Sequence, residues 1–309
     1  MIKYLKQADI DYDKWDACIT KSINSYVYAY SWYLDIVAGE WDALVDDDYQ
    51  SVFPLPFRSK MGVKYIYQPV FTQVSGVFTS NLQDKNKLQA FLDAIPQDFK
   101  LIEININKFY IPTADKNIEV KKNSNIELDM ASDYESIYTR YTTNLKRNIK
   151  KAKKNELQIT KGIKPEQLIK LFKDNKGQEI KAYSEIDYVR LGRLIYTLIH
   201  KGMAEIYGTL SSENNLLAAA LFVKDSHRHI FLFSGLNEEG KQKSAMPFLI
   251  DSFIKKHCES AMILDFEGSN NANLARFYRS FGAEEHSYYG IRKINAKYLI
   301  KLGIKLKSL

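Results

Sequence analysis

Three residues near the end of the chain have types and spacing that could serve a group-transfer reaction. Residues 264–283 read LDFEGSNNANLARFYRSFGA, so that Asn271, Tyr278 and Gly282 follow one another at intervals of seven and four residues. We expect a buried strand over 261–267, a polar turn, and a helix over 272–281 that stops at the glycine. A phenol two turns into that helix could protonate a leaving group held at the end of the strand. The alternative is a crossover in which Tyr278 only packs and Gly282 only ends the helix.

Two carboxylates precede the tyrosine on the expected strand. Asp265 and Glu267 are two residues apart, so a strand would place both on one face. If an amine attacks an activated carbonyl, one of them could be the base that removes its proton, or could anchor it. The alternative is that they cap a helix or form a salt bridge.

The strand, the turn and the helix with Asn271 and Tyr278 resemble the late motif of the GNAT acyltransferase superfamily. This resemblance implies that an acyl-CoA thioester lies along Ser234, Gly235 and Leu236, near Asn271. It also implies a turn of the form Arg/Gln-x-x-Gly-x-Gly/Ala, whose backbone N–H groups bind the pyrophosphate. Here the corresponding residues 240–246 read GKQKSAM, and both glycines are missing. Lys241 would stand for the basic residue, and Ser244 and Met246 for the small ones; the implied cofactor-binding set also includes Lys243 and Ala245.

The chain as a whole resembles the FemABX-like acyltransferases. The resemblance rests on YSWYL at 30–34, on YQPVFTQ at 67–73, on residues 138–152 with Tyr138, Asn144 and Arg147, and on LDFEGS at 264–269 with Phe281 and Gly282. It implies an α/β (α+β) fold of two tandem GNAT-like domains, each a mixed, mostly antiparallel sheet flanked by helices. Some members of this family use aminoacyl-tRNA to extend peptidoglycan precursors.

Hydrophobic periodicity predicts the elements of both domains. The polar stretch at 121–125 gives a boundary, with domains at 1–124 and 125–309. The first domain has no counterpart of the Asn271–Tyr278–Gly282 spacing, so we expect it to shape the acceptor site without a cofactor. Its expected strands are 3–6, 42–47, 51–58, 64–79 and 99–107, with helices at 11–20, 25–39 and 85–94. In the second domain the expected strands are 126–130, 157–161, 203–210, 216–223, 229–235, 261–267 and 288–294, with helices at 133–141, 144–155, 165–175, 184–200, 245–258 and 272–281.

The helix at 144–155 is strongly basic. Eight basic residues and one acidic residue lie between Arg140 and Lys161, while Leu145, Ile149 and Ala152 form an apolar stripe. We expect Asn144 to cap this helix. The basic faces could bind an anion, such as cofactor phosphate, a lipid headgroup or RNA, or could simply be solvated. The residues expected to line the acceptor side are Arg140, Asn144 and Arg147, with Trp32 and Phe71 from the first domain.

Composition limits the remaining choices. The net charge is +7, and residues 291–309 hold six basic residues and no acidic one. Lysines 297, 301 and 305 could line one edge of a helix that touches an acidic membrane surface, although a docked or frayed terminal helix is the alternative. No apolar run approaches a membrane span, no signal peptide is evident, and the two cysteines are far apart, so we expect a cytoplasmic protein. We expect His227 and His229 at the surface, His257 and Cys258 in structural roles, and no metal site.

These observations predict an acyltransferase that moves an acyl or aminoacyl group from an activated donor to an amine acceptor by direct attack. Acyl-CoA is the expected donor, Tyr278 the expected acid, and a small molecule or cell-wall precursor the expected acceptor. One alternative is a ligase that transfers an amino acid from aminoacyl-tRNA to a peptidoglycan precursor. Another is a non-catalytic protein that binds an anionic polysaccharide or lipid.

Overall fold

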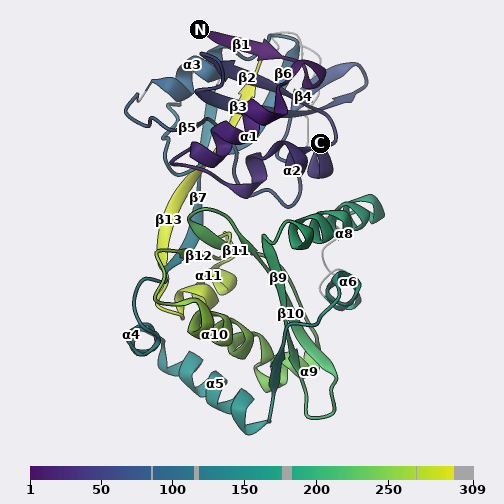
Figure 1. The fold of residues 1–309 in the computed structure, drawn as a ribbon, viewed down its shortest axis with the longest axis vertical. Helices are drawn as coiled ribbons and strands as arrows, with labels where there is room; N and C mark the ends of the chain where they lie inside the picture. Colours follow the sequence, from purple (N-terminus) through teal and green to yellow (C-terminus); the bar gives the residue numbers. More distant parts are fainter. Residues whose placement is uncertain (85, 115–117, 176–182, 269, 296–309) are drawn as a thin grey trace. The chain divides into compact units, whose positions relative to one another are not determined.

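The chain folds into two compact units. The computed structural model describes residues 1–84, 86–114, 118–175, 183–268 and 270–295. One unit comprises Met1–Asn123 and the described residues from Ser287 on, and the other comprises Ser124–His286 (Figure 1). Strands β7 (Ile118–Asp129) and β13 (Glu284–Ile294) each contribute residues to both units.

The first unit is built on a mixed sheet. Its strands lie in the order β1 (Ile2–Leu5), β2 (Trp41–Asp46), β3 (Ser51–Lys60), β4 (Val63–Ile66), β6 (Phe99–Ile106) and β13, with β5 (Phe78–Thr79) beside β3. All of these neighbours are antiparallel except β4 and β6. The helices are α1 (Tyr12–Lys21), α2 (Ser31–Val37) and α3 (Lys87–Asp93), with 3-10 turns η1 (Gln7–Asp9) and η2 (Val27–Ala29).

The second unit has a sheet of the same kind. Its strands lie in the order β8 (Gln158–Thr160), β9 (Ala204–Leu210), β10 (Leu216–Lys224), β11 (Arg228–Leu236), β12 (Ile263–Asp265) and β7. Only the pair of β11 and β12 is parallel among them. The described helices are α4 (Tyr134–Thr139), α5 (Thr143–Lys154), α6 (Pro165–Asp174), α8 (Glu185–His200), α9 (Glu238–Lys243), α10 (Ala245–His257) and α11 (Ala272–Arg279).

The two units repeat one order of elements. In each, a strand is followed by helices, then by three antiparallel strands, then by a further helix or pair of helices, and then by a strand parallel to the preceding one. The first unit makes this series with β1 to β6, and the second makes it with β8 to β12. The predicted pair of mixed, mostly antiparallel sheets flanked by helices is confirmed.

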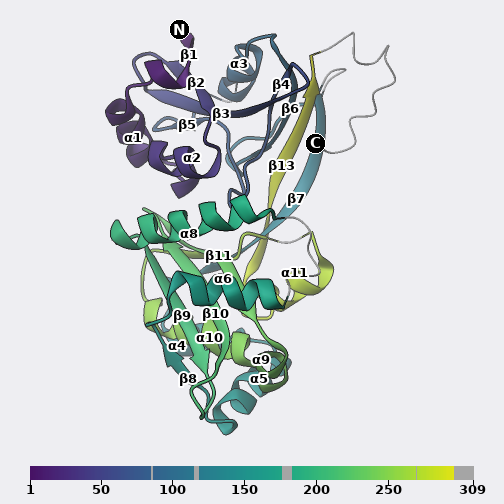
Figure 2. The same ribbon diagram turned by 90° about the vertical axis from the view of Figure 1, so that its right-hand side faces the viewer.

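Helices cover both faces of the second sheet (Figures 1 and 2). On one face, α10 packs against β9 and β10 and against α5. Its Phe253 ring stacks on Phe222 of β10 with centroids 3.7 Å apart. The apolar stripe predicted for α5 is confirmed, because Leu145, Ile149 and Ala152 are buried in this core. On the other face lie α6 and α8.

Several predicted boundaries differ from the structure. The polar residues 121–125, where the domain boundary was predicted, lie inside β7, and the two units divide within this stretch, after Asn123. Residues 287–295, predicted in the second domain, belong with the first unit because β13 pairs with β6 from Tyr289 to Ile294. The strand predicted at 64–79 forms only at its two ends. The helix predicted at 25–39 is divided into η2 and α2 by the extended backbone of Tyr30. The basic segment at 297–305 lies outside the described residues.

Candidate functional site

A β-bulge in β11 determines which of its side chains face the predicted site. Phe231 pairs with Phe222 and Phe233 pairs with Leu221, so Leu232 is an extra residue between them. A bulge of this kind re-aims the side chains that follow it. Before it, Phe231 faces the α10 core; after it, Phe233 packs on Phe172 of α6, with ring centroids 4.6 Å apart.

Because of the bulge, residues 231, 234 and 236 all line one cavity, although residues 231 and 234 are three apart and a regular strand would place them on opposite faces. Gly235 points the other way, toward α6. A Cβ atom at Gly235 would lie 2.9 Å from the backbone nitrogen of Phe172, so this glycine permits the close approach of α6. Of the strand residues predicted to bind the cofactor, Ser234 and Leu236 therefore line the cavity and Gly235 does not.

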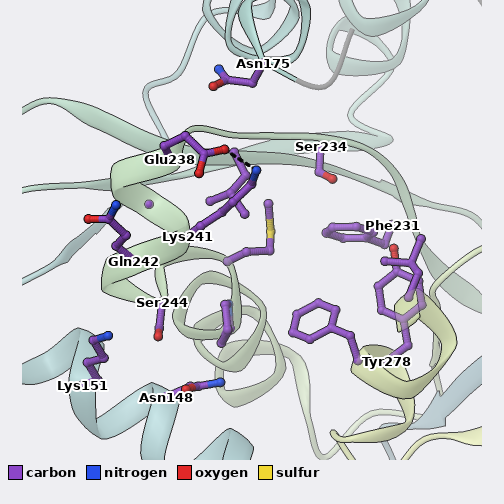
Figure 3. Close-up of a pocket in the computed structure, with 16 residues that line it drawn as sticks. Asn148, Lys151, Asn175, Phe231, Ser234, Glu238, Lys241, Gln242, Ser244 and Tyr278 are labelled. Atoms are coloured by element: carbon purple, nitrogen blue, oxygen red, sulfur yellow. Dashed lines mark hydrogen bonds and ion pairs between the residues drawn. The ribbon is translucent and has the colours of Figure 1, made fainter. Parts of the chain in front are cut away.

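The cavity lies where β11 outlasts its parallel neighbour. The two strands pair from Arg228 with Ile263 to Ile230 with Asp265, where β12 ends and β11 runs on for six more residues. A cavity of about 630 Å³ lies beside this continuation (Figure 3). Its volume falls in the range of sites for small molecules and cofactors. Its apolar lining comes from Phe231, Leu236, Met246, Pro247, Leu274 and Phe277, and its polar lining includes Asn148, Lys151, Asn175, Ser234, Glu238, Lys241, Gln242, Ser244 and Tyr278.

Tyr278 lines this cavity from α11. Its side chain is 6% exposed, and its ring stacks on Phe266 at 4.6 Å and meets Phe231 edge-on at 6.1 Å. No described residue makes a hydrogen bond with its hydroxyl group. Burial raises the pKa of Tyr278, and the charge of Glu267 raises it further, so the phenol is protonated at neutral pH and can donate a proton or a hydrogen bond.

A short helix stands where the resemblance implies a glycine turn. The predicted turn residues 240–243 belong to α9, and Gly240 approaches Leu217 so closely that a Cβ would lie 2.5 Å from its carbonyl oxygen. Ser244, predicted to replace the first glycine, joins α9 to α10 with φ +62°. This left-handed conformation is the one that glycine usually supplies. The Ser244 side chain does not cap α10, so it leaves the first N–H groups of that helix without this acceptor.

The remaining predicted cofactor residues lie in different surroundings. Lys241 lines the cavity but forms an ion pair with Glu238 (Figure 3). Lys243 does not line it and pairs with Glu239 at 2.7 Å. Ala245 is buried in the core. The Oδ1 atom of Asn271 accepts hydrogen bonds from Asn273 N and Leu274 N, at 3.0 and 3.2 Å, and so caps α11.

The two predicted carboxylates do not face the cavity. Asp265 is fully buried; one of its oxygens accepts from Arg228 Nη1 at 2.9 Å and the other from the backbone N–H of Glu267. Burial raises the pKa of Asp265, although Arg228 opposes this effect. The salt-bridge alternative therefore describes Asp265, and a role as base at the cavity does not fit its position. Glu267 is half-buried with φ +55°. It acts on the site through its charge, which raises the pKa of Tyr278.

The predicted acceptor residues of the second unit lie at two places. Arg147 and Asn144 are exposed on α5 and share a hydrogen bond of 3.2 Å. Thr142, and not Asn144, caps this helix, by accepting from Leu145 N. Arg140 lines a different cavity, of about 330 Å³, together with Glu127 and His286. Trp32 and Phe71 belong to the first unit, and the acceptor role of all five residues stays a prediction.

Sequence reasoning missed several residues of the cavity, above all Asn148 on α5, Gln242 on α9 and Phe277 beside Tyr278. Lys151 was predicted only as one of many charges on the basic helix. Asn148 and Lys151 are three residues apart and thus lie on one side of α5. This spacing was the feature of the sequence that could have indicated that both residues face the same cavity. The prediction for His229 was wrong: it is buried, and burial lowers its pKa to about 4. Among the described residues, no cluster of three or more histidine, cysteine or acidic side chains could hold a metal ion.

Solved structures with the same architecture were found by comparison, whereas no protein-family profile and no curated protein matched the sequence. The crystal structure of FemX is 12% identical, with 93% of this chain and 96% of that one covered and a TM-score of 0.66. The chain has the fold of FemX. The same FemX-like fold occurs in the C-terminal domain of a putative lysylphosphatidylglycerol synthetase from Agrobacterium fabrum, at 10% identity, 92% coverage of both chains and a TM-score of 0.58. The structure of L-PGS from Bacillus licheniformis is 11% identical, with 94% of both chains covered and a TM-score of 0.53.

These likenesses confirm the predicted FemABX/GNAT-like fold. At this level of identity they carry the fold alone, so the chemistry of this chain has to be argued from its own cavity. Among the described residues, no helix has the length and apolar character needed to cross a membrane.

Proposed function

We propose that the unit Ser124–His286 carries an acyltransferase site, which moves an acyl group from acyl-CoA to an amine acceptor. The observation that carries this proposal is the cavity beside β11 where that strand continues past the end of β12, with the protonated hydroxyl group of Tyr278 in its lining. The acyl arm lies along β11 on the side of Ser234 and Leu236. The FemX-like fold supports the choice of a transferase over a purely binding protein.

The reaction needs few groups. The amine attacks the thioester carbonyl, a C–N bond forms, and the C–S bond breaks as the tetrahedral adduct collapses. Tyr278 gives its proton, or a hydrogen bond, to the departing sulfur, and general acid catalysis of this kind contributes about 10²–10⁴-fold. A base first removes a proton from the ammonium form of the acceptor, because only the neutral amine has the lone pair that attacks. Neither predicted carboxylate lines the cavity. Glu267 is the better of the two for that role, because its charge acts on Tyr278 whereas Asp265 is committed to Arg228.

The polar end of the donor would lie near the start of α10. The first N–H groups of a helix bind anions. In α10 these are the N–H groups of Ala245 and Met246, since Pro247 has none, and Ser244 leaves them without a side-chain cap. Lys151 and Lys241 line the same cavity and could balance pyrophosphate charge. The ion pair of Lys241 with Glu238 is exposed, and such pairs contribute only about 0–1 kcal/mol, so the donor could displace it.

A second candidate is an aminoacyl donor carried on tRNA. Two observations favour it: α9 and its acidic residues stand where acyl-CoA enzymes have a glycine turn, and the basic helix α5 contributes Lys151 to the cavity. The likeness in fold to FemX and to structures named as lysylphosphatidylglycerol synthetases agrees with this choice. The acceptor would then be a cell-wall precursor or another amine-bearing molecule, and the basic surfaces could contact RNA or an acidic membrane surface.

Thermal unfolding with each donor distinguishes these proposals. A ligand that binds only the native state raises the midpoint by an amount set by its concentration and Kd. A rise with acetyl-CoA and coenzyme A supports the acyl-CoA proposal. A rise only with charged tRNA, lost steeply as salt increases, supports the second candidate. No rise with any of them would overturn both and leave a non-catalytic binding role.

A further inference from the structure

The charged lining residues of the Tyr278 cavity lie away from Tyr278 itself. Lys151 comes from α5, and Glu238 and Lys241 come from α9. Figure 3 shows these three side chains on one side of the cavity, and Tyr278 with Phe231 of β11 on the other side. A group that the proposed reaction places beside the Tyr278 hydroxyl is therefore remote from the charges of the lining.

The lining from α11 and from the first turn of α10 is apolar apart from the hydroxyl group of Tyr278. On α11, Leu274 and Phe277 line the cavity together with Tyr278, and both are half-buried. Leu274 lies four residues before Tyr278, hence on the same face of the helix, and the Phe277 ring lies 5.6 Å from the Tyr278 ring. The first turn of α10 adds Met246 and Pro247. We call the following side chains the apolar part of the cavity: Phe231, Met246, Pro247, Leu274 and Phe277.

The described lining offers no acidic partner beside Tyr278. Among the described residues that line the cavity, Glu238 alone is acidic, and it forms an ion pair with Lys241. Glu267 affects Tyr278 through its charge but does not line the cavity. Moving a charge from water into apolar surroundings costs much free energy unless the charge is paired there. An ammonium group would therefore be unfavourable in the apolar part of the cavity.

The role of Tyr278 determines where the acyl group of the donor lies. In the proposed reaction Tyr278 gives its proton to the sulfur atom, which is bonded to the carbonyl carbon of the acyl group. The acyl group therefore begins beside Tyr278. In an aminoacyl group the α-amino nitrogen is only two bonds from that carbonyl carbon, so it could not reach the charged side of the cavity.

We propose that the donor carries an uncharged, apolar acyl group, which binds in the apolar part of the cavity, and not an aminoacyl group. The acyl chain lies against Leu274 and Phe277, while the polar end of the donor lies toward Lys151 and Lys241. This inference rests on the proposed acyl-CoA function and names the class of its acyl group. The bonds that form and break in the transfer are unchanged.

Two thioesters of nearly the same shape test this inference, because butyryl-CoA ends in a methyl group where β-alanyl-CoA has an ammonium group. Both compounds, and coenzyme A itself, are titrated calorimetrically into the full chain at neutral pH. The Kd of butyryl-CoA should be at least tenfold lower than that of β-alanyl-CoA, and also lower than that of coenzyme A, since burial of apolar surface favours binding. Equal Kd values for the two thioesters, or tighter binding of β-alanyl-CoA, would overturn the inference and leave the proposed function standing. No saturable binding of any of the three compounds would overturn both.

The variant Leu274→Glu tests where the acyl group lies. Its carboxylate would enter the apolar part of the cavity and should reduce the preference for butyryl-CoA over β-alanyl-CoA at least tenfold. The matched control is Asn273→Glu, which makes the same change in charge at an exposed neighbour that does not line the cavity, and it should keep the preference. An unchanged preference in Leu274→Glu, or an equal reduction in Asn273→Glu, would contradict this location. If thermal unfolding shows that Leu274→Glu does not fold, the two thioesters still decide the inference with the unaltered protein.

Discussion

Ser234 of β11 and Tyr278 of α11 line the same cavity, although Phe233 and Gly235, the two chain neighbours of Ser234, face α6 instead. The extra residue Leu232 in β11 makes this arrangement possible. The bulge therefore allows β11 to pack closely against α6 on one face of the sheet and to line the cavity on the other.

Replacing Tyr278 with phenylalanine tests its chemical role. We expect kcat to fall by about 10²–10⁴-fold, with little change in the KM for the donor, because only the proton donor is removed. The melting temperature should change little, since no described residue is bonded to the hydroxyl. Steady-state kinetics and thermal unfolding measure both quantities. Tyr138→Phe, a half-buried tyrosine outside the cavity, should behave like the unaltered enzyme; equal losses in both variants would refute the role of Tyr278.

Replacing Gly235 with alanine tests the seat of α6. The added methyl group would lie 2.9 Å from the backbone of Phe172, and overpacking of this kind costs about 1–3 kcal/mol. Chemical denaturation should show that loss. The control is Gly192→Ala within α8, where the new atom would meet only Ile169 Cδ1 at 3.8 Å; there we expect a gain of about 0.5–1 kcal/mol from helix propensity. An unchanged stability in Gly235→Ala would mean that α6 does not pack as described.

The stability of the second unit should depend on pH through His229. Its folded-state pKa of about 4 lies below the unfolded value near 6.5, so the unfolded state binds more protons between these values. The contribution of His229 to the free energy of unfolding is therefore fully present above pH 6.5. It is lost as the pH falls toward 4, by at most roughly 3 kcal/mol. His229→Phe should flatten the pH profile of unfolding free energy in this window, and the exposed His227→Gln should not. Identical slopes in all three proteins would contradict the buried, neutral imidazole.

Glu238 should weaken the binding of an anionic donor. Its carboxylate lies at the cavity, paired with Lys241, so Glu238→Gln should remove a negative charge there and strengthen coenzyme A binding several-fold, while Lys241→Gln should weaken it. The pair of Lys243 with Glu239 lies outside the cavity lining, and Glu239→Gln serves as the matched control. Calorimetric titration gives the Kd of coenzyme A for each of the three variants. If Glu239→Gln strengthens binding as much as Glu238→Gln does, the effect comes from the change in net charge and not from the ion pair at the cavity.

Much of the fold could be predicted from the sequence. Period-two and period-3.6 patterns located most strands and helices, since a buried face leaves a regular signal. The Leu264–Ala283 element indicated where the cavity lies, and Tyr278, Ser234, Leu236, Lys241, Ser244 and Met246 line it. The sequence of β11 does not reveal the bulge at Leu232, because a bulge is an irregularity in the pairing with the neighbouring strand.

The partners of buried charges were equally hidden from sequence reasoning. Asp265 lies on the expected strand, yet its role is decided by Arg228, 37 residues earlier, on the parallel strand β11. His229 looks like a surface residue of a hairpin, but α10 covers it through Phe253 and His257. In both cases the decisive contact comes from an element far along the chain, and a single sequence does not encode that contact in any spacing.

The central claim is that a thioester donor lies against β11 beside Tyr278, and blocking that strand edge tests it most directly. Acetyl-CoA is titrated calorimetrically into the unaltered protein and into Ser234→Trp, whose indole would project into the cavity beside β11. We predict saturable binding to the unaltered protein and its loss in Ser234→Trp, with the melting temperature of the variant preserved. Equal affinity in both proteins, or no saturable binding to either, would contradict the account.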